Sequence, residues 1–350
     1  MKGKRSFALD LIRITAFFFV FFYHYNMALS SRQIGSPFFL VNAGKNFDFG
    51  QWGTILFVIL SGFTSVKSYQ RSAEGSDKPF GRAMLLYYRK RVLAIVPMYI
   101  ICYIVCSIFA CLPLSMYDAS VVYSLLCLDG YLSTFGVHTC YLIGEWFIGV
   151  ILILYLLFPL IYEAGKRKPG ISLAVTLVLN VFAVILFWKM DAPDCRVLCF
   201  VFPFAYGAFL ALHMKKISHL AGITMIAAAI LFIIVPVPVN YRFLFPAFGV
   251  VSFLAIYYLG ELLSKPGSKA AEGIRLIISK ASKYSFSMFL VHHYLMSLII
   301  GNYVGNYLGR KEYVFYFLLI LAATAVMGFF ITGAADYTKR IFFKKGKSAE

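Results

Sequence analysis

Charged residues are scarce in this chain of 350 residues, and acidic residues are the scarcest, because Asp and Glu together number only 15. All charged residues make up 14% of the sequence, whereas soluble domains carry about 25%. Hydrophobic residues make up 61%, and the mean hydropathy is +0.79. The length would permit two soluble domains, but this composition excludes them and indicates a membrane protein.

The sequence also has no internal repeat, no low-complexity tract and no Gly/Ser-rich or Pro-rich linker that would divide it. We therefore expect a single integral-membrane domain over residues 1–350. Among the seven cysteines, no pair has zinc-ligand spacing joined to a His pair, and we expect no metal. Cys102 and Cys106 share one face of an apolar helix and are expected to be small core residues.

Apolar windows of about 19 residues predict ten membrane-spanning helices. They are expected at 7–29, 49–69, 92–112, 142–163, 171–188, 198–213, 221–237, 244–263, 282–301 and 313–335. A hydrocarbon core of about 30 Å takes about 20 helical residues, so these spans use most of the apolar sequence. The predicted fold is an all-α, polytopic transmembrane helix bundle. Residues 112–140 are expected to form an outer amphipathic or re-entrant piece.

The net charge of +18 indicates topology rather than a nucleic-acid partner, because the basic residues lie in short clusters between apolar runs. If the amino terminus lies inside, 25 of the 33 Lys and Arg residues fall in inner segments and seven in outer loops. This asymmetry places both termini in the cytoplasm and requires an even number of spans, which ten satisfies. We therefore expect a multi-pass protein of the cell membrane.

Ionisable side chains near the centre of a span cost a few kcal/mol, so each one needs a reason. In the first span Asp10 lies three residues before Arg13 and can pair with it on one helix face. His24 follows Arg13 by eleven residues, which places both side chains on one face and about 16 Å apart along the axis. The alternative is an Arg13 that reaches the inner headgroups and a His24 that only bonds a neighbouring helix. A cleavable signal peptide has an uninterrupted apolar run, whereas Asp10 and Arg13 interrupt this one, so we expect the first helix to be retained.

Polar residues also lie at the ends of two other spans. Arg89-Lys90-Arg91 precedes the third span, where it could hold the helix against anionic lipid or grip a phosphorylated cytosolic ligand through the several donors of arginine. Glu145 and Trp146 lie at the outer end of the fourth span. Trp146 is expected in the interfacial aromatic belt, and Glu145 either marks the water boundary or contributes to a site.

Two further spans carry small residues or histidines. The second span is expected to pack closely against its neighbours through the small residues Gly50, Gly53, Ser61 and Gly62. In the ninth span His292 and His293 are adjacent, so their side chains leave the helix about 100° apart. We therefore expect at most one of these two histidines to face any given site.

In order along nearly the whole chain, these segments resemble acyltransferase family 3, integral membrane proteins that acylate carbohydrates and related hydroxyl-bearing molecules. The most specific motif is an Arg, ten residues and a His in the first helix, here Arg13 and His24. Three further stretches are similar to family motifs: Phe57 to Phe63 with Ser61-Gly62-Phe63; Trp146-Phe147-Ile148 followed by Tyr155 and Pro159; and Ser287 to His292. The chain departs from the family at Ala94, because a second Arg often stands three residues after the position of Arg91.

The resemblance implies a membrane O-acyltransferase that moves an acyl group, expected to be acetyl, from cytosolic acyl-CoA to a hydroxyl of a cell-surface or lipid-linked carbohydrate. His24 is then expected to be the general base, and Glu145 a second catalytic candidate that orients it or holds sugar hydroxyls. The acyl-CoA phosphates are expected at Arg13 and at the cluster Arg89-Lys90-Arg91. Because Ala94 stands where a second Arg is often found, phosphate binding would fall to Arg91 alone or to Arg89 and Lys90. The residues expected to support the site are Asp10, Ser61, Trp146 and His292.

Acyl-CoA is expected as a donor substrate, with no permanently bound cofactor. The other expected partners are the carbohydrate acceptor, membrane lipid and separate glycan-assembly proteins, and we expect no fused extracellular SGNH-hydrolase-like domain. A secondary transporter or flippase of a lipid-linked or small anionic substrate is the competing interpretation, since it would also use ten helices with buried charges. The sequence shows no inverted repeat that would favour it. A membrane sensor without catalysis is a third interpretation.

Overall fold

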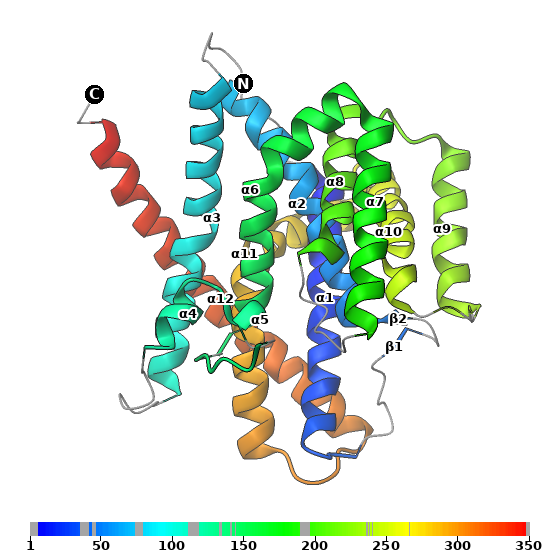
Figure 1. Cartoon of the computed structure of the whole chain (residues 1–350). Coiled ribbons are helices and arrows are strands. Elements are labelled where there is room, and N and C mark those ends of the chain that lie inside the picture. Colours follow the sequence, from blue (N-terminus) through cyan, green and yellow to red (C-terminus); the bar gives the residue numbers. More distant parts are fainter. Residues whose placement is uncertain are drawn as a thin grey trace. The chain divides into compact units, whose positions relative to one another are not determined.

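The structure is a computed structural model (Figure 1). It describes residues 6–35, 42–43, 47–73, 80–110, 119–132, 135–140, 142–143, 145–189, 197–235, 237, 239, 241–265 and 267–347. Each of the ten expected spans falls on one long helix. The long helices are α1 (Phe7–Ser31), α2 (Phe49–Ala73), α3 (Phe80–Phe109), α6 (Glu145–Arg167), α7 (Pro169–Lys189), α8 (Leu198–His213), α9 (His219–Ile234), α10 (Tyr241–Leu263), α11 (Lys269–Tyr303) and α12 (Arg310–Lys347).

The lengths of these helices confirm a polytopic helical membrane protein, and they are compatible with about ten spans. Among the described residues, eight helices are long and apolar enough to cross a membrane, and α8 and α9 are apolar helices of 16 residues each. The connections hold two short helices, α4 (Val121–Leu125) and α5 (Asp129–Leu132), in the segment expected to be an outer amphipathic piece. The strands β1 (Asn42–Ala43) and β2 (Phe47–Asp48) pair antiparallel. The cytoplasmic position of both termini stays a prediction.

Three helices extend well beyond the expected spans. Helix α3 begins at Phe80 rather than at residue 92, α11 begins at Lys269 rather than at 282, and α12 continues to Lys347. Hydropathy windows detect only the part of a helix that crosses the hydrocarbon, and a helix continues into the polar region wherever no breaker ends it. As a result Arg89, Lys90 and Arg91 lie on α3 itself and not in a preceding loop.

The contacts of the chain divide it into two compact units. The first consists of residues 1–23, 40–68 and 156–283, and the second consists of 24–39, 69–155 and 284–350. Because the division passes through several long helices, each unit is assembled from segments far apart in the sequence. The expectation of a single domain stays a prediction.

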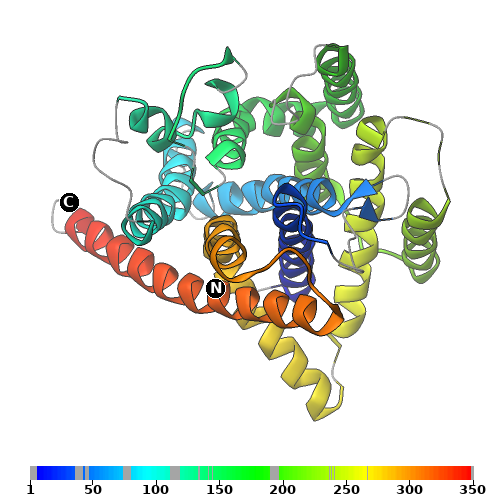
Figure 2. The ribbon, with the colours of Figure 1, turned by 90° about the horizontal axis from the view of Figure 1, so that it is seen from below.

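The first unit is held together by close helix contacts. In it α7 packs on α8 and α9 packs on α10 (Figures 1 and 2). Gly62 of α2 lies directly against the backbone carbonyl of Phe204 in α8, and Gly207 of α8 lies against the carbonyl of Ile59 in α2. Any side chain at either glycine would collide with the other backbone. The predicted role of small residues in the second span is therefore confirmed for Gly62.

The second unit contains the packed pair α3 and α12 (Figure 2). Cys102 and Cys106 of α3 are fully buried, which confirms their expected role as small core residues. Helix α11 is joined to α12 by Ser287, whose Oγ is 2.8 Å from the carbonyl oxygen of Gly328 and 2.8 Å from Oγ1 of Thr332. A buried hydroxyl with two partners fixes the rotation of α11, on which the histidines lie.

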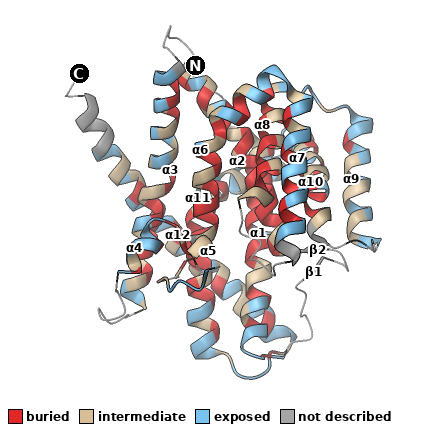
Figure 3. Cartoon of the chain, viewed as in Figure 1, coloured by how far each residue is buried: buried red, intermediate tan, exposed pale blue. Residues whose placement is uncertain are grey.

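Several helices expose large apolar side chains. Figure 3 shows exposed positions along α9, where Leu220 is 78% exposed and Ile223 is 60% exposed. Soluble proteins rarely expose contiguous apolar surface on this scale. Exposed apolar faces of this kind are expected where helices contact the hydrocarbon of a lipid bilayer.

Candidate functional site

The amino-terminal half of α1 carries a buried ion pair that belongs to the first unit. Nη1 of Arg13 lies 3.0 Å from Oδ1 of Asp10, whose side chain is only 2% exposed. Ser282 of α11 links the two groups, because its Oγ accepts a 2.8 Å hydrogen bond from Arg13 and donates a 2.8 Å hydrogen bond to Asp10. The predicted pairing of Asp10 with Arg13 is confirmed. The side chain of Arg13 is 27% exposed, so it is not fully enclosed by this ion pair.

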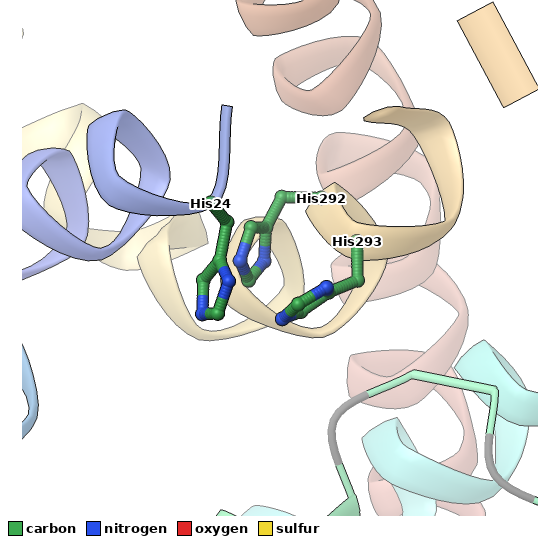
Figure 4. Close-up of side chains that lie close together, drawn as sticks. All are labelled: His24, His292 and His293. Atoms are coloured by element: carbon green, nitrogen blue, oxygen red, sulfur yellow. The ribbon is translucent and has the colours of Figure 1, made fainter. Parts of the chain in front are cut away.

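The carboxyl-terminal half of α1 carries His24 and belongs to the second unit. There it meets two histidines of α11, and Figure 4 shows the three imidazoles pointing toward one another. The ring centroid of His24 lies 3.8 Å from that of His293 and 5.2 Å from that of His292. The centroids of His292 and His293 are 4.6 Å apart. We call His24, His292 and His293 the imidazole cluster.

The imidazole cluster corrects one expectation from the sequence. We expected at most one of the adjacent His292 and His293 to face a given site, because their Cβ directions differ by about 100°. Both rings in fact reach His24. The Cβ direction alone does not fix where an imidazole lies, because rotation about the side-chain bonds can turn both rings toward the same neighbour. His293 is thus a site residue that sequence reasoning missed, although its position next to His292 was a visible signal.

Buried hydrogen bonds hold His24 in position. The two residues after it, Tyr25 and Asn26, are fully buried and both bond to Tyr313 of α12. The hydroxyl of Tyr25 donates to the carbonyl oxygen of Tyr313 at 2.9 Å, and the hydroxyl of Tyr313 donates to Oδ1 of Asn26 at 3.0 Å. These two bonds fix the rotation of the carboxyl-terminal half of α1, and with it the direction of His24.

The protonation of His292 follows from its backbone contact. Its Nδ1 is hydrogen-bonded to the carbonyl oxygen of Phe289, and because a carbonyl only accepts, Nδ1 carries the proton. A neutral His292 therefore presents its lone pair at Nε2.

The ring of Phe289 also packs on Phe147, at a centroid distance of 5.1 Å, and Phe147 lies edge-on to Trp146. Trp146 is thus connected to the imidazole cluster through two aromatic neighbours.

The imidazole cluster could also hold a metal ion. One ring nitrogen from each histidine lies within 4.8 Å of the other two, and among the described residues no other group of three ligating side chains comes together in this way. Nitrogens that share a tetrahedral zinc ion are about 3.4 Å apart, so small side-chain rotations would bring the three to ligating distance. The expectation of no metal rested on cysteine spacing and did not consider these histidines.

We expect the purified protein to carry no stoichiometric transition metal, because among the described residues no carboxylate or thiol joins the three imidazoles to complete a four-ligand site. Elemental analysis of protein purified without chelators, with an affinity tag that contains no histidine, checks this. A metal at one equivalent per chain that is lost in His292→Gln would assign the cluster to metal binding instead. His219→Gln, which alters a histidine of the first unit, is the matched control.

A polar pocket of about 600 Å³ opens beside the imidazole cluster, and His293 forms part of its wall. Arg32, which follows the end of α1, lines the same pocket together with Ser297, Gly301 and Asn302 of α11. One Nη of Arg32 lies 3.4 Å from the carbonyl oxygen of Ser297. Gly301 has no side chain, and this leaves the space that the guanidinium occupies. The pocket therefore combines an imidazole, a cation and several hydrogen-bonding groups.

Arg91 is the most enclosed member of the basic cluster on α3. Its guanidinium carbon lies 5.5 Å from the ring centroid of Tyr87 and 5.0 Å from that of Tyr155. Its Nε and Nη2 are buried and have no hydrogen-bond partner among the described residues. Arg89 and Lys90 are exposed, and Nζ of Lys90 bonds Oγ of Ser72 at 2.8 Å. Of the three, Arg91 is the one with two buried donor nitrogens that lack a hydrogen-bond partner within the described part of the chain.

The remaining predicted residues lie elsewhere. Ser61 is on α2 in the first unit, where its backbone carbonyl accepts a 3.3 Å hydrogen bond from Oγ1 of Thr64. Glu145 is the first residue of α6, but its side chain lies outside the described residues. The structure brings His24 together with His292 in the second unit, and it brings Arg13 together with Asp10 in the first. The structure adds two residues to those predicted from the sequence, His293 beside His24 and Ser282 beside Asp10.

These features define a polytopic helical membrane protein with a buried ion pair on its opening helix and an imidazole cluster beside a polar pocket. The chain belongs to acyltransferase family 3, because residues 6–333 match the family's model, which is described as an acyltransferase domain. Comparisons with curated proteins and with solved structures gave no match. The protein is therefore a multi-pass membrane acyltransferase.

Proposed function

We propose that the protein transfers an acyl group, in the simplest case acetyl, from cytosolic acyl-CoA to a hydroxyl of a carbohydrate, and that it does so in the cell membrane. The observation that carries the proposal is the contact of His24 with His293, which in turn lines a polar pocket large enough for a sugar unit. Family membership supports acyl transfer, and the donor and acceptor classes are inferred from the chemistry of the residues.

In the proposed reaction the acceptor hydroxyl attacks the carbonyl carbon of the thioester. His24 acts as general base and takes the hydroxyl proton as the new C–O bond forms. The tetrahedral intermediate then collapses, the C–S bond breaks, and the CoA thiolate leaves and is protonated. Positioned proton transfer of this kind typically contributes about 10²–10⁴-fold to the rate. His292 and His293 are positioning residues in this scheme, because they contact the ring of His24 and hold its orientation.

The donor would be recognised by arginine. Acyl-CoA carries several phosphate groups, and a guanidinium offers paired donors that match phosphate oxygens. The side chain of Arg13 is 27% exposed beside Asp10, and Arg91 has two buried nitrogens and lies between two tyrosine rings. Arg13 and His24 are eleven residues apart on the continuous helix α1, which corresponds to about 16 Å along its axis. An extended pantetheine arm has roughly this length.

The experiment that tests the proposed function is release of free CoA by the purified full chain supplied with acetyl-CoA and a glycan acceptor. We expect CoA release that depends on the acceptor, with the acetyl group recovered on the glycan by mass spectrometry. A transporter or flippase of a lipid-linked or small anionic substrate would release no CoA. That result with native, folded protein and a panel of cell-surface and lipid-linked acceptors would reject the proposal.

A further inference from the structure

A second cavity in the second unit is almost wholly apolar. It has a volume of about 680 Å³ and lies where α3, α11 and α12 meet, with Ile101 and Val105 on one side and Val326 and Met327 on another. We call it the apolar groove. Val326 is 58% exposed, so this wall of the groove opens on the lipid-facing surface. No proposed step of acyl transfer uses the groove.

The apolar groove adjoins the polar pocket. Three residues, Phe109, Tyr294 and Leu298, line both cavities. A ligand that passes over these three shared residues would have one end beside His293 and Arg32 and the other end among aliphatic side chains open to the bilayer. The two cavities together thus match a molecule with a polar head and a long hydrocarbon chain.

The charge of the polar pocket indicates the kind of head group. Arg32 lines it, and the described residues of its wall include no Asp or Glu. A cation with no acidic neighbour in the wall favours an anionic group, and a guanidinium suits phosphate in particular. The sequence places Arg32 in a loop expected on the outer side, at the level where lipid head groups lie.

We propose that the acceptor is a lipid-linked sugar, in which a phosphate joins the sugar to a single long hydrocarbon chain that occupies the apolar groove. The phosphate pairs with Arg32, and the sugar lies in the polar pocket beside His293. The inference rests on the proposed function, because it names the substrate class for the same site. Lipid chains are as apolar as aliphatic side chains, so the groove adds little affinity of its own. Its role is to orient the chain and so to place the hydroxyl near the base.

The test uses the purified full chain in nanodiscs and two photoreactive probes. One is a polyprenyl-phosphate-linked N-acetylhexosamine with a diazirine on its chain, and the other is phosphatidylglycerol with a diazirine on one acyl chain. We expect the first probe to label the α12 segment around Val326 and Met327 at least tenfold more strongly than the second. Equal labelling by both probes would show that ordinary lipid fills the groove and would overturn the proposal.

Two tryptophan variants test whether the groove itself is responsible. Ala323→Trp fills the groove, whereas Ala322→Trp places the same ring at the neighbouring exposed position, which does not line it. We expect Ala323→Trp to lower labelling at least tenfold and Ala322→Trp to leave it unchanged. Val326→Trp, at an exposed position of the groove, serves where Ala323→Trp fails to fold. Unchanged labelling in a folded groove variant would overturn the proposal.

Activity distinguishes failure of this inference from failure of the proposed function. The same sugar is offered as the polyprenyl-phosphate form and as a water-soluble methyl glycoside. We expect Ala323→Trp and Arg32→Gln to lower acetylation of the lipid-linked form at least tenfold relative to the methyl glycoside. Acetylation of both forms with equal efficiency, unaffected by the variants, would reject the lipid-linked acceptor and leave acyl transfer standing. Selective labelling without any CoA release would reject acyl transfer alone.

Discussion

Replacement of His24 by alanine is expected to lower the rate constant kcat for acyl transfer by at least 10²-fold while the protein still inserts and purifies normally. The variant removes the group proposed to accept the hydroxyl proton, and general-base catalysis typically contributes about 10²–10⁴-fold. His24 is only partly buried, and the adjacent Tyr25 and Asn26 keep their bonds to Tyr313. The measurement is acceptor-dependent release of CoA at saturating acetyl-CoA.

His219→Ala is the matched control for the His24 experiment. His219 belongs to the first unit, and its Nδ1 bonds the hydroxyl of Tyr258 at 2.8 Å, so its loss removes an imidazole and one hydrogen bond from a place unrelated to the cluster. We expect this control to retain activity within a few fold. His24→Ala that works at the native rate would rule out His24 as the base, whatever the other variants show.

Replacement of Arg13 by alanine is expected to have two separable effects. Asp10 is 2% exposed, and without Arg13 it would be a buried charge that has lost its counter-ion, although Ser282 still donates to it. Removing one partner of a buried ion pair typically costs about 3–5 kcal/mol, so thermal unfolding should begin at least about 5 °C lower. Binding of acetyl-CoA should also weaken by about 10–100-fold, because a charge-assisted hydrogen bond contributes about 1.5–3 kcal/mol.

A double variant separates the two effects of Arg13. In Asp10→Asn with Arg13→Gln, both charges are removed and the hydrogen bonds through Ser282 can still form. We expect its unfolding temperature to return close to that of the native protein, while binding of acetyl-CoA stays weak in titration calorimetry. Native affinity in this double variant would show that Arg13 acts only on stability and binds no donor.

The helices could be predicted from the sequence because a membrane crossing is a local property. About 20 consecutive apolar residues suffice to indicate it, and no knowledge of neighbours is needed. For the same reason the pairing of Asp10 with Arg13 was predictable, since both residues lie on one turn of one helix. The extents of α3, α11 and α12 were missed because hydropathy gives no signal once a helix leaves the hydrocarbon.

Contacts between distant segments could not be predicted in this way. Ser282 is 272 positions from Asp10, and a serine near the edge of a span has no pattern that points to a partner. Tyr155, which stacks on Arg91, comes from another helix, and no periodicity relates the two. For His293, the angle between neighbouring side chains was correct, but the inference from it failed because the path of α1 relative to α11 was unknown.

The hydrogen bond between Nδ1 of His292 and the carbonyl oxygen of Phe289 limits the routes by which a proton could leave His24 in the proposed reaction. An imidazole relays a proton by accepting one at one ring nitrogen and releasing another from the second ring nitrogen. In His292 the second nitrogen is Nδ1, whose proton is hydrogen-bonded to the carbonyl oxygen of Phe289, and a backbone carbonyl cannot take up that proton. His292 therefore cannot pass a proton onward. His293 is the member of the imidazole cluster that lines the polar pocket, so in the proposed reaction a proton taken up by His24 would reach water through His293, which then relays the proton as well as holding the ring of His24 in position.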